Sequence, residues 1–177
     1  RIGIDCRLWD ETGVGRYIRN LVYNLQKIDK KNEYVLFILF KDKEEILKQI
    51  QNDKFKTTEA DIRWHSLKEQ LEFPRILKRE NLDLMHFTYF SVPLFYNRPF
   101  VVTIHDLIQS HYASGKASTL PFPLYNIKRI GYRKVLENAV SKAKKIIVPL
   151  QSVENDLVNT LKVSKDIISI TNEGFDV

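Results

Sequence analysis

Runs of apolar, largely β-branched residues alternate along the chain with segments in which apolar residues recur at helical spacing. Seven of the runs are predicted to be strands, at residues 2–8, 33–40, 61–66, 83–88, 100–106, 145–150 and 166–171. Five segments between them have helical periodicity, at residues 15–28, 43–51, 67–80, 124–143 and 152–162. Several strands are apolar on both faces, which is typical of a parallel sheet covered by helices. The pattern predicts an α/β fold with a doubly wound, mostly parallel, Rossmann-like sheet of about seven strands.

Length and composition favour a single domain over residues 1–177. With 44% hydrophobic and 11% aromatic residues, the chain can bury one sizeable core. Its longest uncharged stretch near the middle, residues 84–97, is shorter than the roughly 20 apolar residues that cross a bilayer. The chain opens directly before one predicted strand and stops at "NEGFDV", just after another. We therefore expect a domain cut from a longer protein.

The first predicted strand carries three residues of chemical interest. Cys6, the one cysteine, lies on its apolar side, which predicts a packed thiol and favours a reducing, cytoplasmic location. Asp5 and Arg7 share one face of the strand. They are expected to pair with each other or to hold neighbouring loops.

Ligands of doubly wound sheets bind beyond the carboxyl ends of the strands. The loop after the first strand, "WDETGVGR", has Gly13 and Gly15 before a helix, whose free N–H groups favour a diphosphate. Tight turning without a ligand is the alternative. The dinucleotide fingerprint fails because Ile18 stands at the third glycine position, and no Gly-Lys-Ser/Thr gives a P-loop. Arg16 is either a surface ion pair or a contact to phosphate or acceptor.

The fifth predicted strand ends in His105 and Asp106. A histidine there can donate a hydrogen bond to a sugar hydroxyl or move a proton, and Asp106 can orient it or cap the next segment. His65 and His86 fall within predicted strands and are expected to be core histidines. Because no two histidines are closely paired on one element, no metal site is predicted. The long segment 109–123 is predicted to be a loop that gates an acceptor.

The net charge of +6 is concentrated in residues 125–145, which hold seven basic residues and one acid. Apolar positions at helical spacing predict a core face there and leave a basic face. That face is either solvated or lies on an anionic membrane. Nucleic acid is disfavoured, since no aromatic-rich platform accompanies the charge. The membrane-facing candidates are Lys128, Arg129, Arg133 and Lys134.

Four segments together resemble the N-terminal half of a GT-B glycosyltransferase of family 4, a group that includes many mannosyltransferase-like enzymes. They are "IGIDCRL" followed by "TGVGRYIRNLVYNL", then "DLMHFTYFSVP", then "PFVVTIHDL", and finally residues 133–177. They occur in family order, and residues 41–82 resemble the family least.

The resemblance implies a two-domain enzyme with a cleft between Rossmann-like halves. The N-terminal half would hold the acceptor and close over the donor phosphates, while the C-terminal half, absent from this chain, would carry most nucleotide-sugar contacts. The implied reaction moves a sugar, with mannose as a candidate, from a nucleotide diphosphate to a glycan or lipid-linked acceptor, as in polysaccharide biosynthesis. It retains the anomeric configuration and requires no metal or other cofactor. The isolated piece would be inactive. The enzyme would be cytoplasmic, with a peripheral position on the inner face of the membrane as a further expectation.

The resemblance also implies roles for individual residues. The loop Gly13, Val14, Gly15 and Arg16 would face the donor diphosphate or the acceptor, and His105, beside Asp106, would touch the donor sugar near the reacting carbon. Tyr89 and Ser152 are candidates for the acceptor loop. The family's Ser-x-x-Ser after the sixth strand is here "PLQS", and Glu173 is inserted before Gly174. Two alternatives stay open: a non-catalytic Rossmann-like module that binds a partner or an anionic ligand, and an oxidoreductase that binds a nicotinamide.

Overall fold

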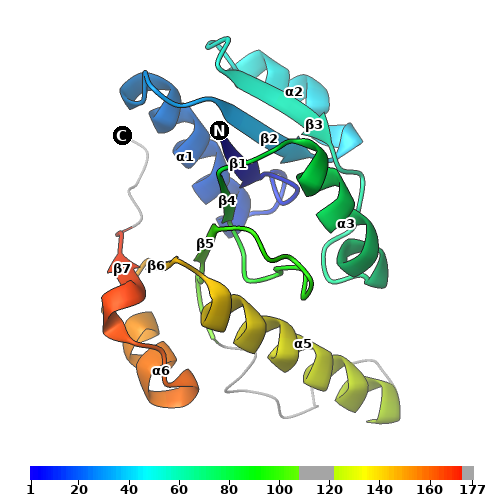
Figure 1. Ribbon diagram of the computed structural model, residues 1–177, viewed down its shortest axis with the longest axis vertical. Coiled ribbons are helices and arrows are strands. Elements are labelled where there is room, and N and C mark those ends of the chain that lie inside the picture. The colour runs from blue at the N-terminus through cyan, green and yellow to red at the C-terminus, as the bar shows by residue number, and fades with distance from the viewer. Residues whose placement is uncertain (108–121, 173–177) are drawn as a thin grey trace.

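A computed structural model describes residues 1–107 and 122–172, except for the side chains of residues 122–125, 127 and 128. Seven strands form one sheet in the order β3-β2-β1-β4-β5-β6-β7, and all six neighbouring pairs are parallel (Figure 1). The strands are β1 (Ile2–Asp5), β2 (Tyr34–Ile38), β3 (Phe55–Glu59), β4 (Leu84–Phe87), β5 (Phe100–Thr103), β6 (Lys145–Val148) and β7 (Ile168–Ile170). The helices are α1 (Gly13–Ile28), α2 (Lys43–Gln49), α3 (Leu67–Arg79), α5 (Phe122–Lys142) and α6 (Gln151–Leu161), and two short 3₁₀ turns are η1 (Phe40–Asp42) and η2 (Lys165–Ile167). The predicted α/β, Rossmann-like parallel sheet is confirmed.

The helices cover the two faces of the sheet and enclose two apolar clusters. Ile18 and Val22 of α1 and Ile46 of α2 pack against Ile4 and Leu36 on one face. On the other face, α3, α5 and α6 pack against a second cluster, which includes Phe37, Phe87, Phe100, Val102, Phe73, Leu136 and Leu157. Residues of α5 predicted for its core face, among them Ala139 and Val140, are buried there. In the described part of the chain, no helix combines the length and apolar character needed to cross a membrane.

The strand order reverses direction between β1 and β4. The chain winds outward from β1 to β3 and then returns through α3 to place β4 on the other side of β1. Such a reversal opens a crevice at the carboxyl ends of the two strands, because their following loops leave in different directions. The loops after β1 and β4 therefore border this crevice.

The prediction of a strand at residues 61–66 is wrong. The third strand is instead Phe55–Glu59, with the sequence FKTTE. It lies at the edge of the sheet with a single neighbour, β2, so polar threonines are tolerated there and no continuous apolar run is required. The apolar signal of residues 61–66 came from Ile62, which is buried, and from Trp64. His65 is consequently an exposed loop residue with a left-handed backbone, at φ 56°, and not a core histidine.

Two other sequence predictions concern segments outside the described residues. The proposed gating loop at 109–123 falls largely outside the described residues, which resume at residue 122. The insertion of Glu173 before Gly174 falls outside them as well.

The prediction of a buried Cys6 thiol is confirmed, since its side chain is fully covered. Burial, and to a smaller extent the charge of Asp5, raises the pKa of this thiol.

Candidate functional site

The crevice at the reversal brings together three segments that are distant in the sequence. Tyr17, on the first turns of α1, meets His105, just after β5, with ring centroids 5.0 Å apart and nearly perpendicular planes. Tyr89, just after β4, lies on another side of His105, with its ring centroid 6.4 Å away and the two planes 25° apart. Three of the predicted parts of the site therefore lie next to one another in this crevice: the start of α1, Tyr89 and His105.

A backbone contact fixes the orientation of the His105 ring. Its Nε2 lies 3.0 Å from the carbonyl oxygen of Thr88, and because a carbonyl only accepts hydrogen bonds, Nε2 is the donor. Asp106 follows and is exposed. Burial, and then the charge of Asp106, raises the pKa of Tyr89 to about 12. The Tyr89 hydroxyl thus keeps its proton at neutral pH and is available as a donor.

A chain of hydrogen bonds lies beneath this group. The Tyr17 hydroxyl is 3.0 Å from the Thr103 hydroxyl, which is 2.8 Å from Nε2 of His86. His86 is buried in β4, which confirms the prediction of a core histidine. Burial, and then the proximity of His105, lowers the pKa of His86 to about 4. The ring is neutral at physiological pH and holds Thr103, and through it Tyr17, in place.

The predicted glycine loop is the first turn of α1, since the helix begins at Gly13 and not at residue 15. Neither glycine has a left-handed backbone. A Cβ on Gly15 would lie 2.9 Å from the carbonyl oxygen of Leu8 and closer still to that of Trp9, so Gly15 lets the helix pack on the loop before it. A Cβ on Gly13 would meet nothing within 4 Å, which leaves this side of the turn open to a ligand.

Two recesses meet at Gly13. A cavity of about 220 Å³ lies on one side, and a longer groove of about 620 Å³ runs along α1 on the other. The cavity is lined by Leu8, Glu11, Thr12, Gly13, Val14, Trp64 and Tyr89. The groove includes Arg16, Tyr17, Asn20 and His86 in its lining. Thr12, the residue before α1, makes no capping hydrogen bond with its side chain in the described structure, so the helix start faces this region uncapped.

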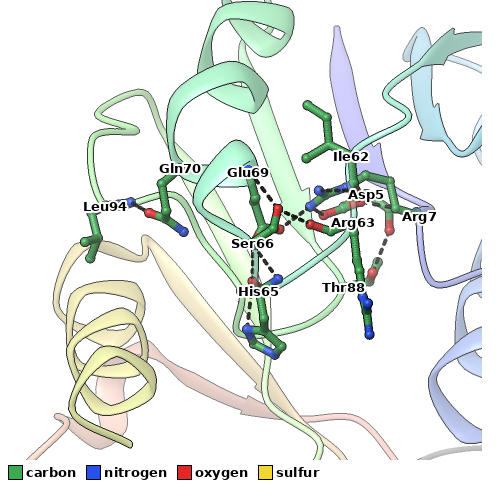
Figure 2. Close-up of polar contacts among 11 residues, drawn as sticks. Asp5, Arg7, Ile62, Arg63, His65, Ser66, Glu69, Gln70, Thr88 and Leu94 are labelled. Carbon is green, nitrogen blue, oxygen red and sulfur yellow. Dashed lines mark hydrogen bonds and ion pairs between the residues drawn. The ribbon is translucent and has the colours of Figure 1, made fainter. Parts of the chain in front are cut away.

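A buried ionic network underlies the site (Figure 2). The Arg7 guanidinium contacts Asp5 through Nε at 2.9 Å and Nη2 at 2.7 Å, and the same Nη2 lies 2.7 Å from Oε1 of Glu69. Nη1 donates to the carbonyl oxygen of Ile62 at 3.2 Å, and the guanidinium stacks 3.7 Å from the ring centre of Phe73. The predicted pairing of Asp5 with Arg7 is confirmed. The third member, Glu69, is fully buried and was not anticipated.

Glu69 extends the network to two loops. Its Oε2 accepts hydrogen bonds from the backbone N–H of His65 at 2.8 Å and from the Ser91 hydroxyl at 2.7 Å. Ser66 caps α3 by accepting from the Glu69 N–H at 3.1 Å. Burial raises the pKa of Glu69, and this effect is opposed by the charge of Arg7 and by the hydrogen bonds from Ser91 and Arg7. The loop before α3 and the loop after β4 are thereby tied to β1.

A family model described as Glycosyltransferase Family 4 matches residues 12–177. The chain belongs to glycosyltransferase family 4. The fold of this family 4 domain is similar to the crystal structure of a glycosyltransferase from Rickettsia africae ESF-5, with a TM-score of 0.53 and 14% sequence identity. The match covers 98% of this chain and 42% of the other, so the chain spans less than half of that protein's length. A comparison with curated protein sequences gives no match.

Four of the remaining predicted residues of the family 4 domain line neither recess in the described part of the chain. Ser152 is exposed on the first turn of α6, and it does not belong to the described lining of either recess. Arg129, Arg133 and Lys134 are exposed on α5, and Arg133 pairs with Glu137 at 2.7 Å. The side chain of Lys128 lies outside the described structure. Within the described residues, no group of three or more His, Cys, Asp or Glu side chains is arranged to hold a metal ion.

Proposed function

We propose that this family 4 domain is the N-terminal, acceptor-side half of a retaining glycosyltransferase. The enzyme would transfer a sugar, with mannose as the first candidate, from a nucleotide diphosphate to a glycan or lipid-linked acceptor. A C-terminal domain absent from this chain would hold most of the nucleotide sugar, so the isolated domain would be inactive. The observation that carries the proposal, besides family membership, is the meeting of the α1 start, Tyr89 and His105 at the strand-order reversal.

Each group at the crevice has a role in this reaction. The uncapped start of α1 and Arg16 would face the donor diphosphate, where backbone N–H groups and a cation stabilise the negative charge of the leaving group. His105, held by Thr88 and flanked by two tyrosine rings, would contact the donor sugar, with Asp106 beside it. In the transfer, the bond from the anomeric carbon to the diphosphate breaks and a bond to the acceptor oxygen forms. The proton of the acceptor hydroxyl passes to the departing diphosphate, and no metal is required.

We also propose where the enzyme lies in the cell. The enzyme would be cytoplasmic and would sit peripherally on the inner face of the membrane, which suits a lipid-linked acceptor. Support comes from the exposed basic side chains of Arg129, Arg133 and Lys134 on one helix. A cationic face of this kind is attracted to anionic lipid within a Debye length of the surface.

The experiment is a transfer assay on the full-length protein with a panel of nucleotide diphosphate sugars, GDP-mannose among them, in the presence of EDTA. His105→Ala should lower turnover at least about 100-fold, as expected for loss of a polar group that acts on the transition state. Tyr23→Ala is the matched control, because Tyr23 is a half-exposed aromatic residue on α1. Proton NMR of the product should show the anomeric configuration of the donor.

Three results would overturn the proposal. Loss of activity in EDTA, restored by a divalent metal, would contradict the metal-free reaction, and an inverted anomer would contradict retention. If the full-length protein transfers none of the sugars and the His105→Ala variant binds every nucleotide as the natural protein does, the domain is a non-catalytic Rossmann-like module.

A further inference from the structure

The smaller cavity beside the start of α1 is lined mainly by apolar and aromatic residues and has polar residues at its edge. Leu8 and Val14 form part of it, and the rings of Trp64 and Tyr89 complete its apolar lining. Glu11 and Thr12 are exposed at its edge. At about 220 Å³ the cavity is smaller than the roughly 300–1,000 Å³ of pockets for drug-sized ligands. It accordingly suits a single small ring better than an extended molecule.

The aromatic walls are set at an angle to each other. The ring centroids of Trp64 and Tyr89 are 6.4 Å apart, with planes inclined by 73°. His65 packs against both rings, at 5.0 Å from Trp64 and 5.8 Å from Tyr89. Trp64 and Tyr89 are only partly buried, and both line the cavity. An electron-rich aromatic face attracts the polarised C–H bonds on the flat side of a sugar ring.

The charge of the rim selects against phosphate. Glu11 contributes a carboxylate, and among the described residues none of those lining the cavity is basic. A carboxylate accepts hydrogen bonds from hydroxyl groups but repels a phosphate. Arg16, by contrast, lines the groove on the other side of Gly13. Gly13 therefore borders both a recess whose described lining contains one cation, Arg16, and a recess whose described lining contains one carboxylate, Glu11. The second suits a neutral polyol better than a phosphate.

The loop that carries Trp64 is held in a fixed shape. His65, its neighbour, has a left-handed backbone at φ 56°, a conformation that costs free energy in a residue other than glycine. The buried Glu69 holds the His65 N–H, and the buried Arg7 holds the carbonyl of Ile62. A ring fixed before the ligand arrives loses less entropy on binding. Strain that is sustained by a buried network beside a cavity points to a binding role for this loop.

From these observations, and resting on the proposed transferase function, we infer that the cavity is the subsite for a neutral sugar ring of the acceptor. Trp64 is the platform on which that ring stacks, and Tyr89 forms the second wall. Glu11 and Thr12 bind hydroxyl groups of the same ring. The acceptor is therefore recognised by its sugar and not by a lipid chain or a phosphate.

Binding can be tested through Trp64, which is the one of this chain's two tryptophans that lines the cavity. Comparison of the natural full-length protein with Trp64→Phe separates its emission from that of every other tryptophan. Trp9 is fully buried, whereas Trp64 is half-buried. Tryptophan emission of the full-length protein should change on titration with a panel of methyl glycosides of common hexoses. The change should disappear in Trp64→Phe and persist in the control Phe95→Ala, which removes an exposed aromatic side chain outside the cavity. Emission that responds only to farnesyl phosphate, or only to nucleoside monophosphates, would overturn the inference.

Kinetics then separate this inference from the proposed function. Trp64→Ala should raise the acceptor KM about 10-fold, as expected for loss of an aromatic contact. Trp64→Phe should restore most of that loss, and slow hydrolysis of the donor without acceptor should be unchanged. An unaltered acceptor KM in an active enzyme refutes the subsite and leaves the transferase standing. An inactive natural enzyme refutes the transferase, while the glycoside titration still decides whether the cavity binds sugar.

Discussion

Replacing Arg7 with methionine should destabilise the domain severely. The guanidinium is the one cation in contact with Asp5 and Glu69 in the described network, and the Arg7 side chain is 1% exposed. Methionine keeps an unbranched chain that can lie against Phe73 but removes the charge and the hydrogen bonds to Asp5, Glu69 and the Ile62 carbonyl. Two carboxylates, one of them fully buried, are left without their cation.

The magnitude follows from the burial of the partners. Breaking a buried ion pair by deleting one member costs about 3–5 kcal/mol, because the other charge stays desolvated. Burial alone would lower the pKa of Arg7, but the carboxylates of Asp5 and Glu69 outweigh it and raise that pKa, which shows that the pair favours the charged state. For a domain of this size, the loss corresponds to a fall in Tm of about 6–20 °C.

The loss should depend on pH in a definite direction. Burial already raises the pKa of Glu69, and without the opposing charge of Arg7 this pKa should lie further above that of the unfolded chain. The folded variant then binds a proton more readily than the unfolded chain does, and its stability falls as pH rises through the raised pKa of Glu69. The deficit relative to the natural protein should be greatest near pH 7 and should shrink toward pH 4.

Urea unfolding followed by tryptophan emission, repeated across this pH range, measures the effect. The matched control is Lys43→Met, which breaks the exposed pair with Glu59 and should change the free energy of unfolding by less than about 1 kcal/mol. Should the methionine variant not fold, Arg7→Lys keeps the charge, loses the forked contact and should show a smaller deficit. A loss below about 1 kcal/mol at neutral pH for Arg7→Met, or one that grows on acidification, would refute the reasoning.

Three further predictions follow from the same structure. Gly15→Ala should lower the free energy of unfolding by about 1–3 kcal/mol, because the new Cβ meets the rigid backbone of Trp9. Gly13→Ala should leave that free energy unchanged or raise it by up to about 1 kcal/mol, and urea unfolding of both variants checks the two expectations. Because the pKa of His86 is lowered to about 4, the folded state favours the neutral ring. The stability that this provides above pH 6.5 should be lost as pH drops from about 6.5 to 4. Replacement of His86 with glutamine should flatten this part of the pH–stability curve. Binding of the full-length protein to phosphatidylglycerol vesicles should weaken by up to about 100-fold when three basic side chains of α5 become glutamine, and phosphatidylcholine vesicles should show no difference. The three are Arg129, Arg133 and Lys134.

Much of the fold could be predicted because most elements carry their own pattern. Strands β1, β2, β4, β5 and β6 are apolar runs within a covered sheet, and α1 and α3 have clear apolar stripes. The edge strand β3 gave no such signal, since Thr57 and Thr58 lie in its middle and only one strand pairs with it. Its position depends on tertiary pairing with β2, which no local pattern records.

The residues of the candidate site likewise differ in whether the sequence predicts them. His105, Tyr89 and the start of α1 follow directly from predicted strands, so the rule that ligands bind beyond strand ends identified them. Trp64 was missed because residues 61–66 were assigned to a strand, and Glu69 was missed because it lies within a predicted helix and not after a strand. The sequence held a signal that favours the correct assignment. Ser66 and Glu69 have the Ser-x-x-Glu spacing of a helix start, and Ser66 does cap α3.

The buried network has a meaning beyond stability. A desolvated ion pair is often no more stable than well-packed apolar side chains, so stability alone does not account for Arg7 and Glu69 in the core. The pair does fix the positions of neighbouring loops, because its hydrogen bonds hold the Ile62 carbonyl, the His65 N–H and the Ser91 hydroxyl at set distances. An apolar core would leave those loops free to shift. Because the loops carry Trp64 and Tyr89, the network sets the shape of the cavity, and disturbing it should alter sugar recognition as well as folding.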